Sequence, residues 1–171
     1  MKTYIALFRG INVGGNNILP MKELKMLLEA SSCRRVRTYI QSGNVVFESE
    51  SPPENVGGLI NERFGFEPQV LLMEKKAFLE SLTGNPYTAA KGNQIHFYFC
   101  QGKPNANIEK LDTLKTESEQ YLIKDQVLYL YAPDGIGRSK LAAGMEKLLG
   151  VPATGRNLNT ISKLVEMLED T

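Results

Sequence analysis

Hydrophobic and polar residues follow two alternating periods along the first 74 residues of this chain. Short runs with a strand-like pattern alternate with stretches in which apolar residues recur at helical spacing. The predicted strands are residues 3–8, 35–40, 44–47 and 69–73, and the predicted helices are residues 20–30 and 56–64. The resulting order, β-α-β-β-α-β, is that of a ferredoxin-like unit.

The same order recurs in the rest of the chain. The predicted strands are residues 94–100, 120–124 and 126–131, with a short closing strand near 151–154, where Pro152 suits only a sheet edge. The predicted helices are residues 75–82, 108–114, 138–149 and 158–168. We therefore predict an α+β fold of two tandem ferredoxin-like units, each an antiparallel sheet with helices on one face. Residues 1–74 form the first unit, and residues 75–171 form the second, with a linker helix and a C-terminal helix.

This topology predicts that two distant turns of the first unit lie together. In a split β-α-β-β-α-β unit, the first and second strands run in the same direction. The loop RGINVGGNN, residues 9–17, leaves the first strand, and the turn QSGN, residues 41–44, leaves the second. Both should emerge at the same edge of the sheet, where they form one candidate site.

The residues of these two turns suit anion binding, but they also suit demanding turns. Glycines at positions 10, 14 and 15 let a ligand approach the backbone amides, and Arg9 offers a fork for phosphate or carboxylate. The pattern G-x-x-x-G-G matches neither common nucleotide-binding motif, so a purely structural loop stays open. In the second turn, Gly43 supplies positive φ and Asn44 a side chain that caps the turn.

Two segments of the second half carry similar chemistry. PDGIGRSK, residues 133–140, places Arg138, Ser139 and Lys140 at a predicted helix start, which indicates a bound anion or a nearby carboxylate such as Asp134. In TGRNLNT, residues 154–160, Asn157 or Asn159 is a candidate N-cap. Arg156 would pair with an acidic residue or with a bound anion.

Composition narrows the classes of partner. Twenty basic and nineteen acidic residues give a net charge of +1, which argues against strong nonspecific nucleic-acid binding. Arg35, Arg37 and Tyr39 share one strand face, a pattern that a charged edge strand explains as well as a base-stacking surface does. No apolar run approaches a membrane span, and the two cysteines are far apart, so we expect a cytoplasmic protein with reduced thiols.

The sequence contains no recognisable set of catalytic or metal-binding residues. His96 is the single candidate base for a nucleophilic pair, and Cys100 lies four residues along the same strand face, too far for a direct bond. This favours a structural histidine. The sequence shows no histidine-rich or cysteine-rich metal site and predicts no metal, leaving only carboxylate-type Mg²⁺ binding open. Catalytic residues and cofactors stay unassigned.

Four stretches of the sequence resemble the bacterial domain of unknown function 1697 family. They are YIALFRGINVGGNNILPMKELKMLLE, VRTYIQSGNVVF, DGIGRSKL and RNLNTISKL, and the likeness is most specific over the first 47 residues. The resemblance implies tandem ferredoxin-like halves and a role for the residues of these stretches, but no activity. Relatives often carry Trp where Leu158 stands here. If that ring stacks on a ligand in the relatives, this chain has lost the contact; if it only packs the helix, leucine is a mild replacement.

The leading hypothesis is a protein that binds a small anionic ligand, such as a nucleotide or a phosphorylated metabolite. The predicted contacts are Arg9, Gly10, Asn12, Gly14, Gly15, Ser42, Gly43, Asn44, Arg138, Ser139, Lys140, Arg156 and Asn157. Single-stranded nucleic-acid binding and a protein-interaction or assembly module without a small-molecule ligand are the alternatives. Homo-oligomers are compatible with the sequence, and whether any reaction is catalysed is left open.

Overall fold

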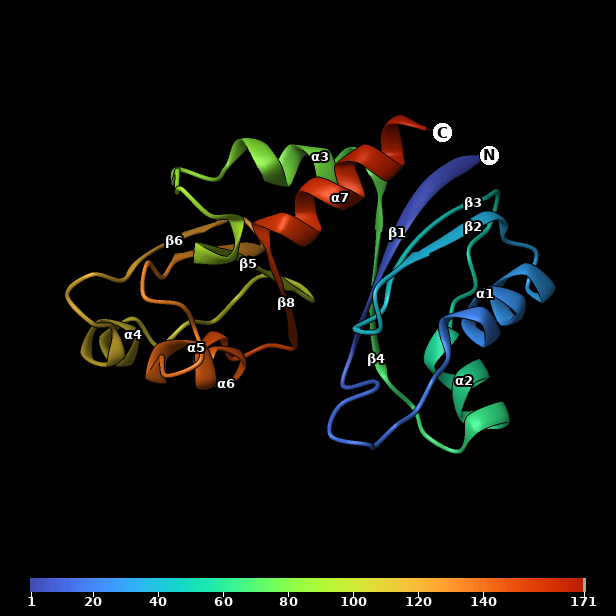
Figure 1. Ribbon diagram of the computed structural model, residues 1–171, viewed down its shortest axis with the longest axis horizontal. Helices are drawn as coiled ribbons and strands as arrows, with labels where there is room; N and C mark the ends of the chain where they lie inside the picture. The colour runs from blue at the N-terminus through green and yellow to red at the C-terminus, as the bar shows by residue number, and fades with distance from the viewer. Residues whose placement is uncertain (171) are drawn as a thin grey trace. The chain divides into compact units, whose positions relative to one another are not determined.

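The computed structural model describes residues 1–170 and confirms the tandem α+β architecture (Figure 1). It contains two four-stranded antiparallel sheets of ferredoxin-like topology. The chain divides into two compact units. Residues 1–80 and the segment from Leu164 onward form the first unit, and Ser81–Lys163 form the second. No helix within residues 1–170 is both long and apolar enough to cross a membrane.

The first unit places its core between one face of a sheet and two helices. Its elements are β1 (Lys2–Arg9), α1 (Met21–Ala30), β2 (Arg34–Tyr39), β3 (Asn44–Ser49), α2 (Val56–Phe64), β4 (Gln69–Glu74) and the beginning of α3 (Lys75–Thr83). The strand order is β2-β3-β1-β4. Alternate residues of β1, Tyr4, Ala6 and Phe8, are buried with Leu24 and Leu28 of α1, as the two-residue period of a strand requires.

The outer strand β2 departs from the predicted pattern at both ends. A register shift between Arg34 and Arg37 marks a bulge, and Arg35 there has a φ of 48°. The strand ends at Tyr39, so the prediction that Ile40 belongs to it is wrong. Ile40 instead has a φ of 50°, far from the φ of about −140° of a regular antiparallel strand. The edge position of β2 agrees with the charged-edge interpretation of its arginines.

The second unit repeats the topology with shorter helices. Its elements are the 3₁₀ turn η1 (Gly92–Gln94), β5 (Ile95–Cys100), α4 (Ile108–Leu114), β6 (Gln120–Lys124), β7 (Val127–Tyr131), α5 (Lys140–Ala143), α6 (Met145–Leu149), β8 (Ala153–Asn157) and the beginning of α7 (Leu158–Glu169). The strand order is β6-β7-β5-β8. Leu128 and Leu130 of β7 are buried with Leu141 and Met145 of the short helices.

Two predictions for this unit are wrong in detail. The single helix predicted for residues 138–149 is two short helices, interrupted at Gly144, where the residue with the highest backbone entropy sits in mid-helix. The closing strand begins after Pro152 and extends to Asn157. As predicted, it lies at the edge of its sheet.

The last turns of α7 belong to the first unit and are held there by basic side chains. Arg37 Nη2 donates to Met167 O at 2.6 Å, and Lys75 Nζ donates to Leu168 O at 2.9 Å. Arg37 also lies 3.9 Å from the carboxylate of Asp170. Cations at the end of a helix satisfy its last carbonyls and complement its dipole, so these contacts fix the end of α7 on its unit.

Candidate functional site

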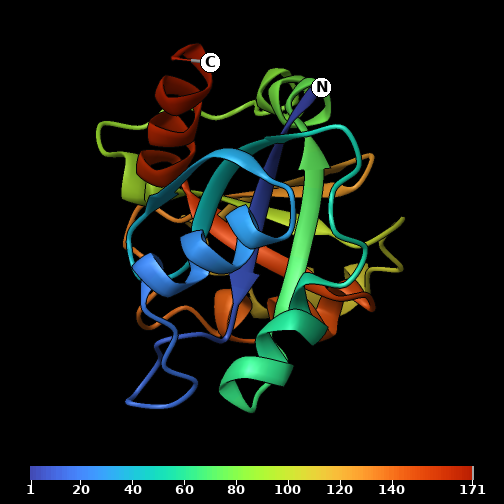
Figure 2. The ribbon, with the colours of Figure 1, turned by 90° about the vertical axis from the view of Figure 1, so that its right-hand side faces the viewer.

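The loop between β1 and α1 is a miniature β-hairpin that projects beyond the sheet (Figure 2). Val13 and Asn16 form an antiparallel bridge, with Asn16 N donating to Val13 O at 2.9 Å. Gly14 and Gly15 at its tip have φ values of 57° and 76°. A two-residue type I′ turn needs positive φ at both central positions. The glycine pair is therefore explained by the turn it makes.

The side chain of Asn12 joins this loop to the turn between β2 and β3. Its Nδ2 donates to Leu19 O at 2.9 Å and to Gln41 O at 2.8 Å, while its Oδ1 accepts from Leu19 N at 2.8 Å. The predicted proximity of the two turns is confirmed. One amide therefore holds both ends of the loop and the neighbouring turn in place through contacts within the chain.

The turn between β2 and β3 is packed too closely for any residue but glycine at position 43. Gly43 has a φ of 87°, and a Cβ there would lie 2.6 Å from Phe8 Cβ. Its backbone oxygen accepts from Phe8 N at 2.9 Å. The buried Asn44 donates to Tyr39 O at 2.9 Å and to Ser42 Oγ at 3.2 Å, which confirms its predicted capping role.

These two segments, residues 9–18 and 40–44, are here called the loop edge. Arg9 provides their one formal charge, and they contain no acidic residue. Arg9 Nη1 donates to the neutral side chain of Gln69 at 3.2 Å. The remaining polar groups are amides, a hydroxyl and exposed backbone. The loop edge is thus a weakly cationic, donor-rich end of the first sheet.

Backbone strain is concentrated in the loop edge. Six non-glycine residues within residues 1–170 have positive φ, and three of them, Asn12, Asn17 and Ile40, lie here. Asparagine tolerates this region, but for a β-branched residue such as Ile40 it is a genuine outlier. Such conformations cost about 1–3 kcal/mol each and gather at functional sites. The sequence pattern missed Ile40, because the residue continues an alternating strand pattern.

The predicted anion segment at residues 133–140 is organised by a buried carboxylate. Ser139 Oγ donates to Glu119 Oε2 at 2.5 Å and accepts from Ala142 N at 3.1 Å, so it caps α5. Of the two predicted alternatives, a bound anion or a nearby carboxylate such as Asp134, the pairing with Asp134 is not observed, because Asp134 accepts from Ser118 Oγ at 2.7 Å. Because α5 has only four residues, its dipole offers little to an anion.

Arg138 and Lys140 remain the exposed cations of that segment. Neither side chain makes a hydrogen bond or ion pair with any residue in the described part of the chain. Their predicted role as ligand contacts stays a prediction.

The segment at the end of β8 behaves as a helix start. Asn157 Oδ1 accepts from Thr160 N at 3.0 Å, confirming Asn157 as an N-cap. Arg156 Nη1 donates to the adjacent Gly155 O at 2.9 Å, and burial lowers the pKa of its guanidinium to about 10. The strands β7 and β8 both pair antiparallel with β5, so the segments that follow them begin at the same end of the second sheet.

The side chain of Ser139 makes no hydrogen bond with the described part of the segment that follows β8. It donates to Glu119, which precedes β6.

His96 is a buried structural histidine. Its Nε2 lies 2.9 Å from Asn93 O, and burial lowers its pKa below the usual value. Cys100 Sγ lies 3.9 Å from Tyr98 O rather than near the imidazole. Across residues 1–170, no group of three or more His, Cys, Asp or Glu residues is placed to hold a metal ion. The geometry therefore offers no nucleophilic pair at this strand.

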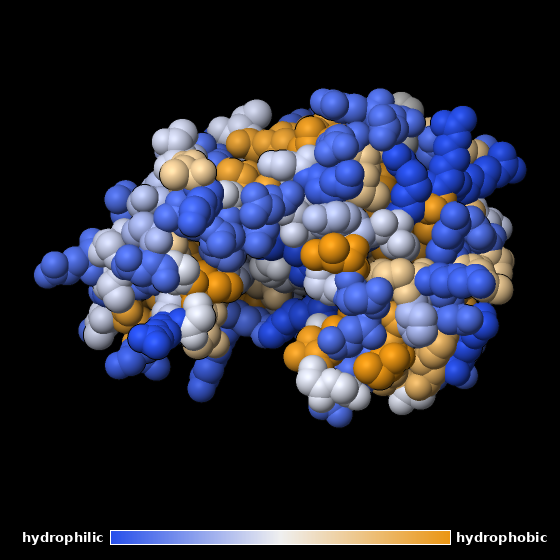
Figure 3. Space-filling model, viewed as in Figure 1, coloured by the Kyte–Doolittle hydropathy of each residue, from blue (hydrophilic) through white to orange (hydrophobic). Residues whose placement is uncertain are grey.

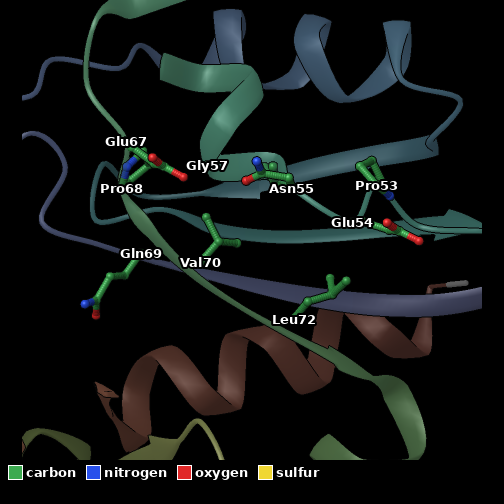
Figure 4. Close-up of a pocket in the computed structure, with 10 residues that line it drawn as sticks. Pro53, Glu54, Asn55, Gly57, Glu67, Pro68, Gln69, Val70 and Leu72 are labelled. Carbon is green, nitrogen blue, oxygen red and sulfur yellow. The ribbon is translucent and has the colours of Figure 1, made fainter. Parts of the chain in front are cut away.

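A groove of about 380 Å³ lies between α2 and β4, and no sequence pattern predicts it (Figure 4). Val70 and Leu72 point from β4 toward α2, and Glu67 and Glu54 stand at opposite ends. A Cβ on Gly57 would lie 3.6 Å from Glu67 Oε1. Because an anion is favourable beside the first turn of a helix, the start of α2 accounts for this carboxylate without a ligand.

Comparisons with known proteins agree with the fold. A solved structure, the conserved bacterial protein SP0830 from Streptococcus pneumoniae, superposes with a TM-score of 0.68 at 23% sequence identity and covers 98% of each chain. No curated protein matches the sequence. The family model DUF1697, described as a protein of unknown function, matches residues 1–129. The chain therefore belongs to the DUF1697 family.

Proposed function

We propose that the loop edge of the first unit binds a small anionic ligand, with nucleotides and phosphorylated metabolites as the first classes to test. The observation that carries the proposal is the clamp by Asn12, which holds the β1–α1 loop against Gln41. A loop that is already ordered loses little conformational entropy when a ligand binds.

The charge and hydrogen-bonding groups of the loop edge support an anion. Arg9 supplies positive charge in a segment pair without a carboxylate. Gly14 and Gly15 are exposed residues, and their amide nitrogens donate no hydrogen bond to any residue between 1 and 170. Arginine forks and exposed backbone amides are the groups that proteins use for phosphate and carboxylate.

The strain at the loop edge supports a functional role over a purely structural one. Asn12, Asn17 and Ile40 hold positive φ within two short segments. A surface turn without a function would be free to replace Ile40 with a residue that prefers this conformation. In the proposal, the strained residues are retained because the shape that they give the loop edge is the one that binds the ligand.

Thermal unfolding against a ligand panel tests the proposal. The panel contains inorganic phosphate, pyrophosphate, nucleotides and phosphorylated sugars, measured with the unmodified chain, with Arg9→Gln and with Arg34→Gln. A ligand at about 100 times its Kd adds roughly 2.7 kcal/mol of stability, or about 5–11 °C in a chain of this size. We expect this shift to vanish in Arg9→Gln and to persist in Arg34→Gln. A panel without any shift, or a shift that Arg9→Gln keeps, would contradict the proposal.

A further inference from the structure

Three aliphatic side chains of the loop edge are held in solvent. Val13 is 64% exposed, Ile18 is 55% exposed and Ile40 is 49% exposed. Val13, Ile18 and Ile40 directly neighbour Asn12, Asn17 and Gln41 in the sequence. Those three residues are joined to one another, since Asn12 N donates to Asn17 O at 3.0 Å and the Asn12 side chain donates to Gln41 O. Figure 3 shows orange side chains over the β1–α1 loop of the first unit. Single exposed aliphatic residues are ordinary, whereas a group of them indicates a contact surface.

Ile40 is unfavourable in two independent ways. Its backbone has a φ of 50°, which branched side chains avoid, and its side chain is half in water. Glycine or asparagine would relieve the first cost, and any polar residue would relieve the second. The turn that Gly43 N closes on Ile40 O sets the backbone conformation of Ile40 but does not require an aliphatic side chain there. The aliphatic side chain itself is therefore the feature that needs a reason.

The loop edge also has too little charge for a polyanion. Arg9 is its one cation, whereas recognition of several phosphates needs several basic groups or a metal ion. The remaining affinity must come from neutral hydrogen bonds and apolar contact. The aliphatic groups supply the second of these.

We infer that the ligand of the loop edge is an amphiphilic anion, in which one phosphate or carboxylate head group is joined to an aliphatic chain. Resting on the proposed function, this inference narrows the ligand class at the same site. The head group meets Arg9 and the exposed amides of Gly14 and Gly15, and the chain covers the aliphatic side chains of Val13, Ile18 and Ile40.

An alkyl phosphate series tests the inference directly. Inorganic phosphate and butyl, hexyl and octyl phosphate, all below their micelle-forming concentrations, are titrated into the full chain by calorimetry. Burial of each methylene tightens binding by about two- to fourfold, so Kd should fall roughly 16- to 250-fold from butyl to octyl phosphate. A Kd that does not depend on chain length would overturn the inference.

Single variants locate the apolar contact. We expect Val13→Asn, Ile18→Asn and Ile40→Asn each to weaken octyl phosphate binding about three- to tenfold while leaving butyl phosphate nearly unchanged. Ile108→Asn is the matched control, because Ile108 is 49% exposed outside the loop edge, and it should bind as the unmodified chain does. Ile40→Asn should fold well, since asparagine accepts positive φ.

The outcomes separate the inference from the proposed function. Phosphate binding that requires Arg9 but ignores chain length leaves the proposed function standing and overturns the inference. Absence of binding by every member of the series and of the ligand panel overturns both. Chain-length dependence that Ile108→Asn weakens as much as Ile40→Asn means nonspecific adsorption, and it overturns the inference.

Discussion

Asn12 donates a hydrogen bond from its side chain to the backbone oxygen of Gln41 at 2.8 Å, although 29 residues separate the two. The same amide group exchanges two hydrogen bonds with Leu19. One half-buried side chain therefore closes a loop and attaches it to a second turn. Removal of that side chain should affect both segments at once.

Asn12→Ala should destabilise the first unit by roughly 2–4 kcal/mol. The variant loses the side-chain hydrogen bonds of Asn12 to Leu19 and Gln41, worth about 0.5–1.5 kcal/mol each. Alanine also resists the φ of 52° at this position. Urea unfolding measures the change. Asn16→Ala is the control, since the hydrogen bond of Asn16 is made by its backbone, and it should change stability by less than about 0.5 kcal/mol. Equal effects of the two variants would show that the clamp contributes nothing.

Gly43→Ala should be far more damaging than Gly14→Ala. Both positions have positive φ, but a Cβ at position 43 would collide with Phe8 and Ile11, while a Cβ at position 14 meets nothing within 4 Å. We expect about 1 kcal/mol for Gly14→Ala and at least 3 kcal/mol for Gly43→Ala, where overpacking is added. Thermal unfolding of both variants provides the comparison, and similar melting temperatures would contradict the packing argument.

Ser139→Ala should cost roughly 2–4 kcal/mol. It removes a helix N-cap, worth about 0.5–2 kcal/mol, and takes a hydrogen bond from the buried carboxylate of Glu119. Ser118→Ala is the matched control, since its bond to Asp134 is exposed and should be worth less than about 1 kcal/mol. Chemical denaturation of both variants tests the difference. A loss of under 1 kcal/mol in Ser139→Ala would mean that Glu119 finds another donor.

His96 should make the protein less stable as the pH falls below about 6.5. Burial lowers its pKa in the folded state, so between that pKa and the unfolded value near 6.5 the unfolded chain binds more protons. The stability is therefore lost as the pH drops through this window, by up to about 1.4 kcal/mol per pH unit. The unfolding free energies of the unmodified chain and of His96→Gln are measured at pH 7.5, 6.5 and 5.5. Below pH 6.5 the unmodified chain should lose stability more steeply than the variant, and above it the two pH dependences should be the same. Parallel pH dependences would refute this role.

Arg37→Ala should loosen the end of α7. The variant removes the donor to Met167 O and the nearby positive charge for Asp170. Amide hydrogen exchange over residues 164–169 should accelerate several-fold, because local opening becomes easier. Arg34→Ala on the same strand is the control, because the Arg34 side chain makes no hydrogen bond or ion pair with a residue between 1 and 170, and it should leave these amides unchanged. Unaltered exchange in Arg37→Ala would show that apolar packing alone holds the helix.

The element order and the meeting of two distant turns follow from periodicity and topology, and both could be predicted. Single-residue conformations could not. Ile40 continues an alternating pattern, yet the turn geometry gives it positive φ, a choice that tertiary packing makes. Gly144 interrupts a helix whose apolar spacing is intact, because propensity and pattern disagree there. The partner of Ser139 is Glu119 rather than Asp134, since long-range pairing leaves no mark in local sequence.

The attachment of α7 also bears on the order in which the chain is made. Arg37 and Lys75 are synthesised well before Met167 and Leu168, whose carbonyls they bind. At about 5–20 residues per second, translation of Ser81–Lys163 occupies on the order of 4–17 s. The second unit is contiguous in sequence and can be completed first, while the first unit waits for its last segment. The first unit is therefore translated first for the most part but is completed last.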